Sequence, residues 1–215
     1  DLGNAARCVG AMRRGFGGGI FTVKMRSGWC QSEENFLEAS KVAEGEGADG
    51  IILHPRFKSQ GYSGNADWGK IALLAASTQL PVAGSGDVRS AAEAVRRIAE
   101  CGIAAVMIGR AALSRPWIFR DAARLMEGLP PLGEPSSREI ADDLLLQYDD
   151  LAAERGKHVA VSDIKKFAAW AMRDFEHSSL ARKAVMEIKD PEAMRRAIMS
   201  FGDGTLDFAY GGGDG

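Results

Sequence analysis

The chain of 215 residues has little cysteine and no long hydrophobic run. Its three cysteines, Cys8, Cys30 and Cys101, include no close pair, which indicates free thiols in a reducing compartment and predicts a cytoplasmic protein. The longest apolar runs, such as 104–108, fall far short of the roughly 20 residues that a membrane span needs. The sequence therefore predicts no membrane partner and no disulfide scaffold.

An excess of charge of one sign is also lacking. Lys and Arg number 27 against 29 Asp and Glu, which gives a net charge of −2. Any surface that binds a nucleic acid must therefore be local. The stretch 155–201 has a local basic excess, and it forms either a solvated helical face or a docking face for a polyanion.

Four short apolar runs, at 20–25, 50–54, 80–84 and 104–108, alternate with amphipathic stretches. Nearly continuous apolar runs of this length are typical of parallel strands buried on both faces. The stretches between them indicate helices, including one over 90–100 with Asp87 as its cap. This alternation predicts an α/β fold with a parallel sheet.

The pattern changes after Met126. The segment 128–136 contains Pro130-Pro131 flanked by glycines, which excludes a helix and predicts a linker. Beyond it the sequence predicts helices over 137–154, 163–173, 180–187 and 191–201 and no strand. We therefore expect an α/β domain over 1–127, a small all-α helical bundle over 137–201, and a disordered tail over 202–215.

Polar, basic or glycine-rich residues follow each predicted strand. In a parallel α/β array the carboxyl ends of the strands meet at one rim, where ligands bind. The glycines would let the backbone approach a phosphate, and Arg110 would add positive charge. The rim residues are, strand by strand, Lys24 and Arg26, then His54 and Arg56, then Gly84-Ser85-Gly86-Asp87, and finally Gly109-Arg110.

Each of these features also has a purely structural interpretation. Lys24 would then be an edge lysine with a solvated head, and His54 a core histidine with its hydrogen bonds satisfied. The glycine-rich segment 84–87 would be a tight turn before a helix, and Gly109-Arg110 a turn with a surface arginine. The phosphate site rests on all four occurring at the same rim.

Four motifs resemble the tRNA-dihydrouridine synthase family. They are VKMRSGW (23–29), HPR (54–56), PVAGSGD (81–87) and MIGRAALSRPWIF (107–119), and the resemblance extends from about Phe21 to Phe201. The RPWIF continuation is the most specific part, since other flavin barrels share only the IGR portion. The resemblance implies a flavoprotein with a TIM barrel, of which about the last half is present here, followed by a helical tRNA-binding domain.

The resemblance also implies an activity and residue roles. The reaction would reduce the C5=C6 bond of a uridine in tRNA with NADPH, through FMN, and a cysteine would protonate C5. Arg56 would line the substrate cleft, and Lys165 and Lys166 would touch tRNA. The residues that match positions of the family around FMN are Lys24, His54, Ser85 (an Asn in the family), Gly86, Asp87, Gly109 and Arg110.

The first residues depart from the family pattern. The segment 1–6 resembles the remnant of the Asn-x-Gly-Cys-Pro motif, with Asn4 at the cysteine position, so that Cys8 becomes the candidate proton donor. The segment 13–19 resembles the glycine-rich loop after that motif and leads directly into the first strand. The chain therefore resembles an N-terminally truncated and internally shortened member, whose four strands would leave two unpaired edges that favour self-association.

Two other functions stay open. One is a noncatalytic tRNA- or RNA-binding remnant that uses the basic residues between Arg155 and Arg196. The other is a phosphate-binding α/β barrel enzyme of different chemistry. The RPWIF motif and the appended helices argue against the second of these.

Overall fold

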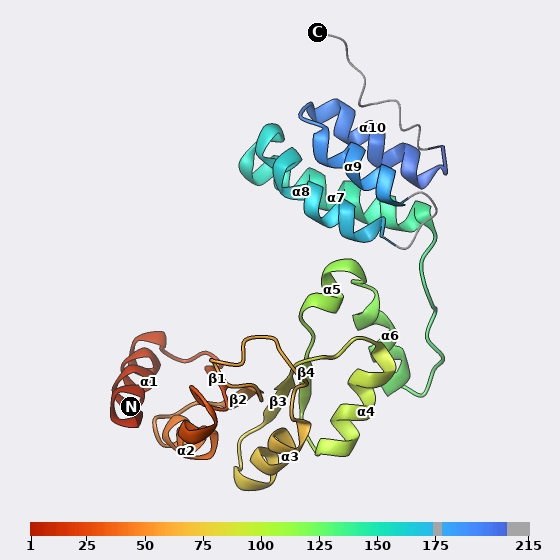
Figure 1. Cartoon of the computed structure of the whole chain (residues 1–215). Helices are drawn as coiled ribbons and strands as arrows, with labels where there is room; N and C mark the ends of the chain where they lie inside the picture. Colours follow the sequence, from red (N-terminus) through yellow and green to blue (C-terminus); the bar gives the residue numbers. More distant parts are fainter. Residues whose placement is uncertain (174–177, 206–215) are drawn as a thin grey trace. The chain divides into compact units, whose positions relative to one another are not determined.

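A computed structural model describes residues 1–173 and 178–205 of the chain. They form two compact units, one of Asp1–Ala111 with Leu125–Leu129 and one of Ala112–Arg124 with the described part of Pro130–Gly215. The elements, drawn in Figure 1, are α1 (Leu2–Phe16), β1 (Thr22–Arg26), the 3-10 turn η1 (Gln31–Glu33), α2 (Phe36–Gly45), β2 (Gly50–His54), α3 (Trp68–Ser77), β3 (Val82–Ser85), α4 (Ala91–Cys101), β4 (Ala105–Met107), α5 (Arg110–Ser114), α6 (Ile118–Met126), α7 (Ser137–Arg155), α8 (Lys157–Ala171), α9 (Ser178–Glu187) and α10 (Pro191–Gly202).

The first unit is built on a parallel sheet in the order β1-β2-β3-β4, so that the four predicted strands are confirmed. Helices α2, α3 and α4 connect successive strands (Figure 1). Parallel neighbours need such crossovers, because a tight turn cannot return the chain to the start of the next strand. The predicted α/β class is therefore correct.

Side chains alternate between the two faces of this sheet. Ile51, Leu53 and Val82 are buried among the apolar residues of α2, α3 and α4. The opposite face is open: Thr22, Lys24, Ala105 and Met107 are exposed there, and Ile52 and Ala83 are half-buried. The prediction that the strands are buried on both faces is thus wrong, because helices of the described residues cover only one face.

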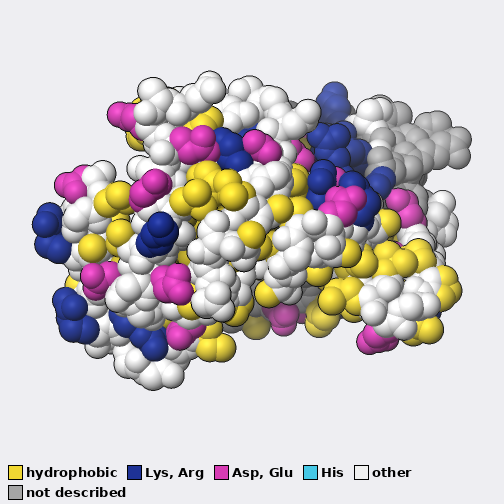
Figure 2. All heavy atoms as spheres, turned by 90° about the horizontal axis from the view of Figure 1, so that it is seen from below, with side chains coloured by type: hydrophobic (Ala, Val, Ile, Leu, Met, Phe, Trp, Pro, Cys, Tyr) yellow, Lys and Arg dark blue, Asp and Glu magenta, His cyan; other side chains and the backbone are white. Residues whose placement is uncertain are grey.

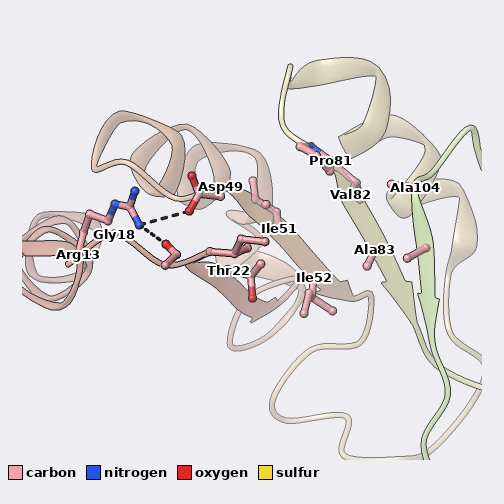
Figure 3. A pocket seen from close by; sticks show the side chains of 14 residues that line it. Arg13, Gly18, Thr22, Asp49, Ile51, Ile52, Pro81, Val82, Ala83 and Ala104 are labelled. Carbon is pink, nitrogen blue, oxygen red and sulfur yellow. Dashed lines mark hydrogen bonds and ion pairs between the residues drawn. The ribbon is translucent and has the colours of Figure 1, made fainter. Parts of the chain in front are cut away.

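A hollow of about 510 Å³ lies over the amino-terminal half of the open face. Figure 3 shows Ile52 and Ala83 on the opposite side of their strands from Ile51 and Val82. At its margin Arg13 donates to the carbonyl of Gly19 at 2.9 Å and pairs with Asp49 (Figure 3). The hollow is therefore a consequence of the uncovered sheet, and it lies away from the predicted rim.

The segment before β1 is a helix. Asp1 caps α1 by accepting from the backbone N–H of Asn4 at 3.1 Å, and Gly17 ends the helix with a φ of 74°. The interpretation of 13–19 as a glycine-rich loop is wrong, because Arg13 to Phe16 are helical and only the three glycines follow as a loop. Asn4 and Cys8 thus belong to a helix and not to a loop at the end of a strand, and the internal shortening inferred from these residues is not supported.

Helices α7 to α10 share an apolar core in the second unit. Ile164, Met172, Met194 and Ile198 are fully buried there. Ser136 caps α7 in a capping box with Glu139, and Asp190 caps α10, with Pro191 in its first turn. Trp117, from the RPWIF motif, packs against the same core, so this motif joins the start of α6 to the core of the four helices.

The segment between α6 and α7 has no helix or strand over 127–136, as its prolines predict. Asp121 and Arg120 of α6 bond to the backbone of Leu132 and Gly133. Helix α10 extends to Gly202, and most of the tail expected over 202–215 lies outside the described residues. Within the described part of the chain, no helix is long and apolar enough to cross a membrane.

On the face drawn in Figure 2, Lys and Arg side chains lie among Asp and Glu side chains, with hydrophobic side chains between them. This mixture matches the small net charge of −2.

The open sheet face and the free edges of β1 and β4 lead us to predict self-association of this chain, because unpaired strand edges and uncovered apolar side chains invite a second copy. Size-exclusion chromatography with light scattering will show a mass that rises with concentration. The double variant Ala83→Glu/Ala105→Glu, which places charge on the open face, will shift the protein toward the monomer.

Ala76→Glu is the matched control, because Ala76 is an exposed residue of α3. A compact monomer at every concentration for the unmodified chain would contradict the prediction.

Candidate functional site

The predicted rim residues lie at or just after the carboxyl ends of the four strands, and therefore along the same edge of the sheet. The register pairs Arg26 of β1 with His54 of β2, and Ser85 of β3 with Met107 of β4. Lys24 lies two residues before Arg26 and therefore on the same open face as His54. This neighbourhood follows from the parallel register alone.

Lys24 and Arg26 differ in what they do at this rim. Lys24 is exposed and makes no hydrogen bond or ion pair within the described residues. The Arg26 guanidinium donates to the carbonyls of Phe57 at 2.9 Å and Gly61 at 3.2 Å. Lys24 thus offers a cation to a ligand, whereas Arg26 holds the loop that follows β2.

His54 is bonded to a buried arginine. The Arg56 side chain is only 2 % exposed, and one of its terminal nitrogens lies 3.3 Å from Nε2 of His54. Its other terminal nitrogen donates to Asp87 at 2.7 Å and to the carbonyl of Gly64 at 2.6 Å. The Asp87 carboxylate also accepts from the backbone N–H of Ala66 at 2.7 Å.

These contacts set the protonation of both titratable groups. Burial, followed by the charges of Arg26, Lys24 and Arg56, lowers the pKa of His54 to about 4, against the opposing charge of Asp87. Burial alone would raise the pKa of Asp87, but the hydrogen bonds from Ala66 and Arg56 outweigh it and lower that pKa. At neutral pH the imidazole is therefore neutral and the carboxylate charged.

The turn after β3 packs tightly against His54. Gly86 has a φ of 125°, and a Cβ there would lie 2.8 Å from Cβ of Ala66 and 3.1 Å from Cδ2 of His54. Asp87 has a φ of 57°, the only positive value of a non-glycine residue in the described chain. Asp87 does not cap the following helix as predicted, because its carboxylate is turned to Arg56; Ser90 caps α4 instead.

The loop between β2 and α3 is fastened from several sides. Arg56 bonds to the carbonyls of Ser63 and Gly64, and the Trp68 indole N–H donates to the carbonyl of Gly86 at 3.1 Å. Together with the bonds of Arg26, these contacts fix the loop to the ends of β1 and β3. A loop held in this way can position a ligand without first having to order itself.

Gly109 and Arg110 follow β4 at the same rim. A Cβ on Gly109 would meet no atom within 4 Å, so its backbone is open to approach. The exposed Arg110 guanidinium lies over the ring of Tyr62 at 4.5 Å. Tyr62, which the sequence analysis missed, is 65 % exposed in the loop after β2, and its signal was an aromatic residue within a polar loop.

The structure moves two predicted residues away from ligand contact. Arg56 was expected to line a substrate cleft, but its side chain is buried. It bonds to Asp87 and to the carbonyls of Ser63 and Gly64, so it holds the rim together without facing a ligand. Cys8 is exposed on α1, a helix that packs against α2, and it does not lie at the carboxyl end of a strand. Of the three cysteines, Cys30 is the one that follows a strand at its carboxyl end.

Lys165 and Lys166 lie on α8 in the second unit. The Lys165 ammonium donates to the carbonyl of Met186 at 2.9 Å, in the last turn of α9. Lys166 is exposed. Lys165 therefore joins two helices, whereas Lys166 is the one whose charge is open to a partner.

These residues suit a ligand with an anionic group and a flat ring. Lys24 and Arg110 supply exposed positive charge, and Gly86 and Gly109 bring backbone to the rim. The neutral His54 offers a hydrogen bond without competing charge. An FMN molecule, with a phosphate at one end and a polar ring at the other, fits this set of donors.

The chain is thus an α/β protein with cationic side chains and glycines at the carboxyl edge of its sheet, and sequence comparison gives its family. Residues 3–201 match the dihydrouridine synthase family (Dus), so the chain belongs to it. It is 35% identical over 188 residues to a probable tRNA-dihydrouridine synthase of Mycobacterium tuberculosis (strain H37Rv) and 33% identical to tRNA-dihydrouridine synthase B of Xanthomonas axonopodis pv. citri. These alignments cover 87% and 86% of this chain but 48% and 56% of the relatives, so the chain spans about half of their length.

Acid will test the neutral state of His54. Because the unfolded pKa of histidine is about 6.5 and the folded value is about 4, the unfolded chain binds more protons between these values. The stabilisation that comes from the neutral His54 is therefore complete above pH 6.5. As the pH falls toward 4, the free energy of unfolding decreases by on the order of 3 kcal/mol. Urea denaturation at a series of pH values will show this fall, and His54→Gln will reduce it.

His158→Gln is the control, because His158 is exposed on α8. An unchanged pH dependence in His54→Gln would show that His54 is not held neutral.

Proposed function

We propose that this chain is the FMN- and tRNA-binding part of a tRNA-dihydrouridine synthase, which reduces the C5=C6 bond of uridine in tRNA with NAD(P)H. Family membership and the names of the relatives support the reaction. The assignment of FMN as the cofactor is supported by Lys24, His54 and Arg110, which share one rim with the glycine turn at Gly86.

The sheet fits part of a (β/α) barrel. Its strands lie in consecutive order and each is followed by a helix, whereas a doubly wound sheet reverses its order at the ligand site. The open face would be the inside of such a barrel. The distribution of side chains agrees, since the helices cover the outer face alone.

Each rim residue then has a defined task. Bound FMN would supply the hydride chemistry, with the hydride reaching C6 and a proton reaching C5 while NAD(P)H is oxidised. Arg110 and the backbone around Gly86 and Gly109 would hold the phosphate. Lys24 would lie against the ring, where its free charge stabilises the negative charge of the reduced form.

The target uridine has to leave its stack to reach the rim. Tyr62 and Trp29 are exposed aromatic side chains in the loops after β2 and β1, and they suit contact with bases. In the second unit the exposed Lys166 would pair with a phosphate of the tRNA. Lys165 would contribute by holding α8 to α9.

A noncatalytic tRNA-binding protein is the second candidate function. One observation favours it: Cys8, the predicted proton donor, lies within helix α1 and not at the carboxyl end of a strand. The two functions differ in whether uridine is reduced, so an assay on tRNA separates them.

Flavin binding gives the first test. Purified protein will show the visible absorbance of oxidised FMN or take up added FMN with quenching of its fluorescence. Lys24→Ala and Arg110→Ala will each lower the affinity for FMN by roughly tenfold, because each removes one charge-assisted contact.

Lys41→Ala and Arg14→Ala are the matched controls, since both residues are exposed helix positions away from the rim. A protein that never takes up FMN, or an affinity equally reduced in the controls, would overturn the cofactor assignment.

Binding and reduction of tRNA give the second test. Lys166→Ala will weaken tRNA binding and reduce the slope of log affinity against log salt by about one. NADPH-dependent loss of tRNA uridine will then report catalysis, and Cys8→Ala will abolish it if Cys8 donates the proton.

The control here is Lys41→Ala, in the other unit of the chain. An active Cys8→Ala variant would remove Cys8 from the reaction, and tRNA binding without uridine loss would favour the noncatalytic function.

A further inference from the structure

Arg56 is the largest side chain that is fully buried in this structure. A guanidinium carries only donors and stays charged, so burying it is costly unless each donor finds an acceptor. Its acceptors are Asp87, the carbonyls of Ser63 and Gly64, and one ring nitrogen of His54. The histidine contact is the unusual one among them, because it joins two groups that can both be cations.

The direction of that hydrogen bond follows from chemistry. Arg56 has no acceptor to offer, so Nε2 of His54 has to accept and carries no proton. A proton on Nε2 would place two N–H donors and two positive charges 3.3 Å apart. A neutral ring whose Nε2 accepts has its proton on Nδ1.

The arginine is itself held in place. Asp87 accepts from Arg56 at 2.7 Å, and the N–H of Ala66 fixes the same carboxylate oxygen. Gly86 lies beside the Cδ2–Nε2 edge of the imidazole, and a Cβ at this position would come within 3.1 Å of Cδ2 and 3.3 Å of Nε2. The opposite edge, with Nδ1, makes no hydrogen bond within the described residues.

We propose that Arg56, anchored by Asp87, is a positioning residue that keeps His54 neutral with its proton on Nδ1, so that Nδ1–H donates to an acceptor atom of the bound nucleotide. The ligand part of this inference rests on the proposed function. The tautomer belongs to the chain alone.

The surroundings of His54 oppose protonation on nearly every side. Arg26, Lys24 and Arg56 are the cations that act on it, and Asp87 is the one anion. Asp87 is hydrogen-bonded to Arg56 and Ala66 and not to His54, so it favours an imidazolium through its charge alone. Flavin affinity should accordingly change little between pH 8 and pH 5.5, a range in which an ordinary histidine gains its charge.

Imidazole ¹⁵N NMR on the protein without added ligand tests the tautomer. The signal of His54, assigned by its loss in His54→Gln, will show a protonated Nδ1, an unprotonated Nε2 and no titration down to pH 5. In Arg56→Gln the ring will populate the Nε2–H form and begin to titrate at higher pH. Asp87→Asn keeps an acceptor for Arg56 but removes the negative charge that raises the pKa of His54, so it will keep the Nδ1–H form and will not move the titration to higher pH.

Arg89→Gln is the matched control, because Arg89 is exposed next to Asp87 and acts on its charge without a bond to His54. It will leave the His54 signals unchanged. An Nε2–H tautomer in the unmodified protein, or a normal titration near pH 6.5, would overturn the inference even if no variant folded.

FMN titration separates this inference from the proposed function. Weaker FMN binding at low pH in Arg56→Gln, with a flat profile in the unmodified protein, supports both. If the protein binds no FMN but its His54 shows the Nδ1–H tautomer, the proposed function is contradicted. The role of Arg56 in keeping His54 neutral then still stands. Equal pH profiles in the two proteins contradict the role of Arg56 in binding.

Discussion

The ion pair between the buried Arg56 and the half-buried Asp87 is the contact on which the rim of the sheet depends. It joins the loop after β2 to the turn after β3, and it reaches His54 at the end of β2. A buried charge whose partner is removed destabilises a protein by about 3–5 kcal/mol. The geometry of the rim and the stability of the first unit are therefore coupled through one guanidinium.

This coupling explains why the turn after β3 has unusual backbone angles. Asp87 has to adopt a left-handed conformation to present its carboxylate to Arg56, and Gly86 has to lack a side chain to let His54 and Ala66 approach. Such strain is kept where the surroundings over-determine it. Here the surroundings are the hydrogen bonds from Ala66, Arg56 and Trp68.

The sheet has one well-packed face and one open face, and the two have different uses. The packed face buries Ile51, Leu53 and Ile71 and supplies the apolar stabilisation of the first unit. The open face carries Lys24 and His54 at its carboxyl end. A barrel interior would have this distribution, with the strand ends left for chemistry.

The sequence by itself determined the local features. Four apolar runs fixed the number and positions of the strands, prolines marked the segment before α7, and the motifs identified the family. Lys24, His54 and Arg110 could be placed at one rim because parallel strands share their carboxyl ends. Helix α1 was missed, since its glycines suggested a loop; the structure shows that Asp1 caps this helix and that it packs against α2.

Only the tertiary structure decided what each polar side chain does. Arg56 and Arg26 look alike in sequence as exposed rim cations, yet both are bonded to the loop after β2. Asp87 looked like a helix cap and became the partner of Arg56. These outcomes depend on distances between segments some 30 residues apart in the chain, and no local pattern encodes which donor will meet which acceptor after the strands have paired.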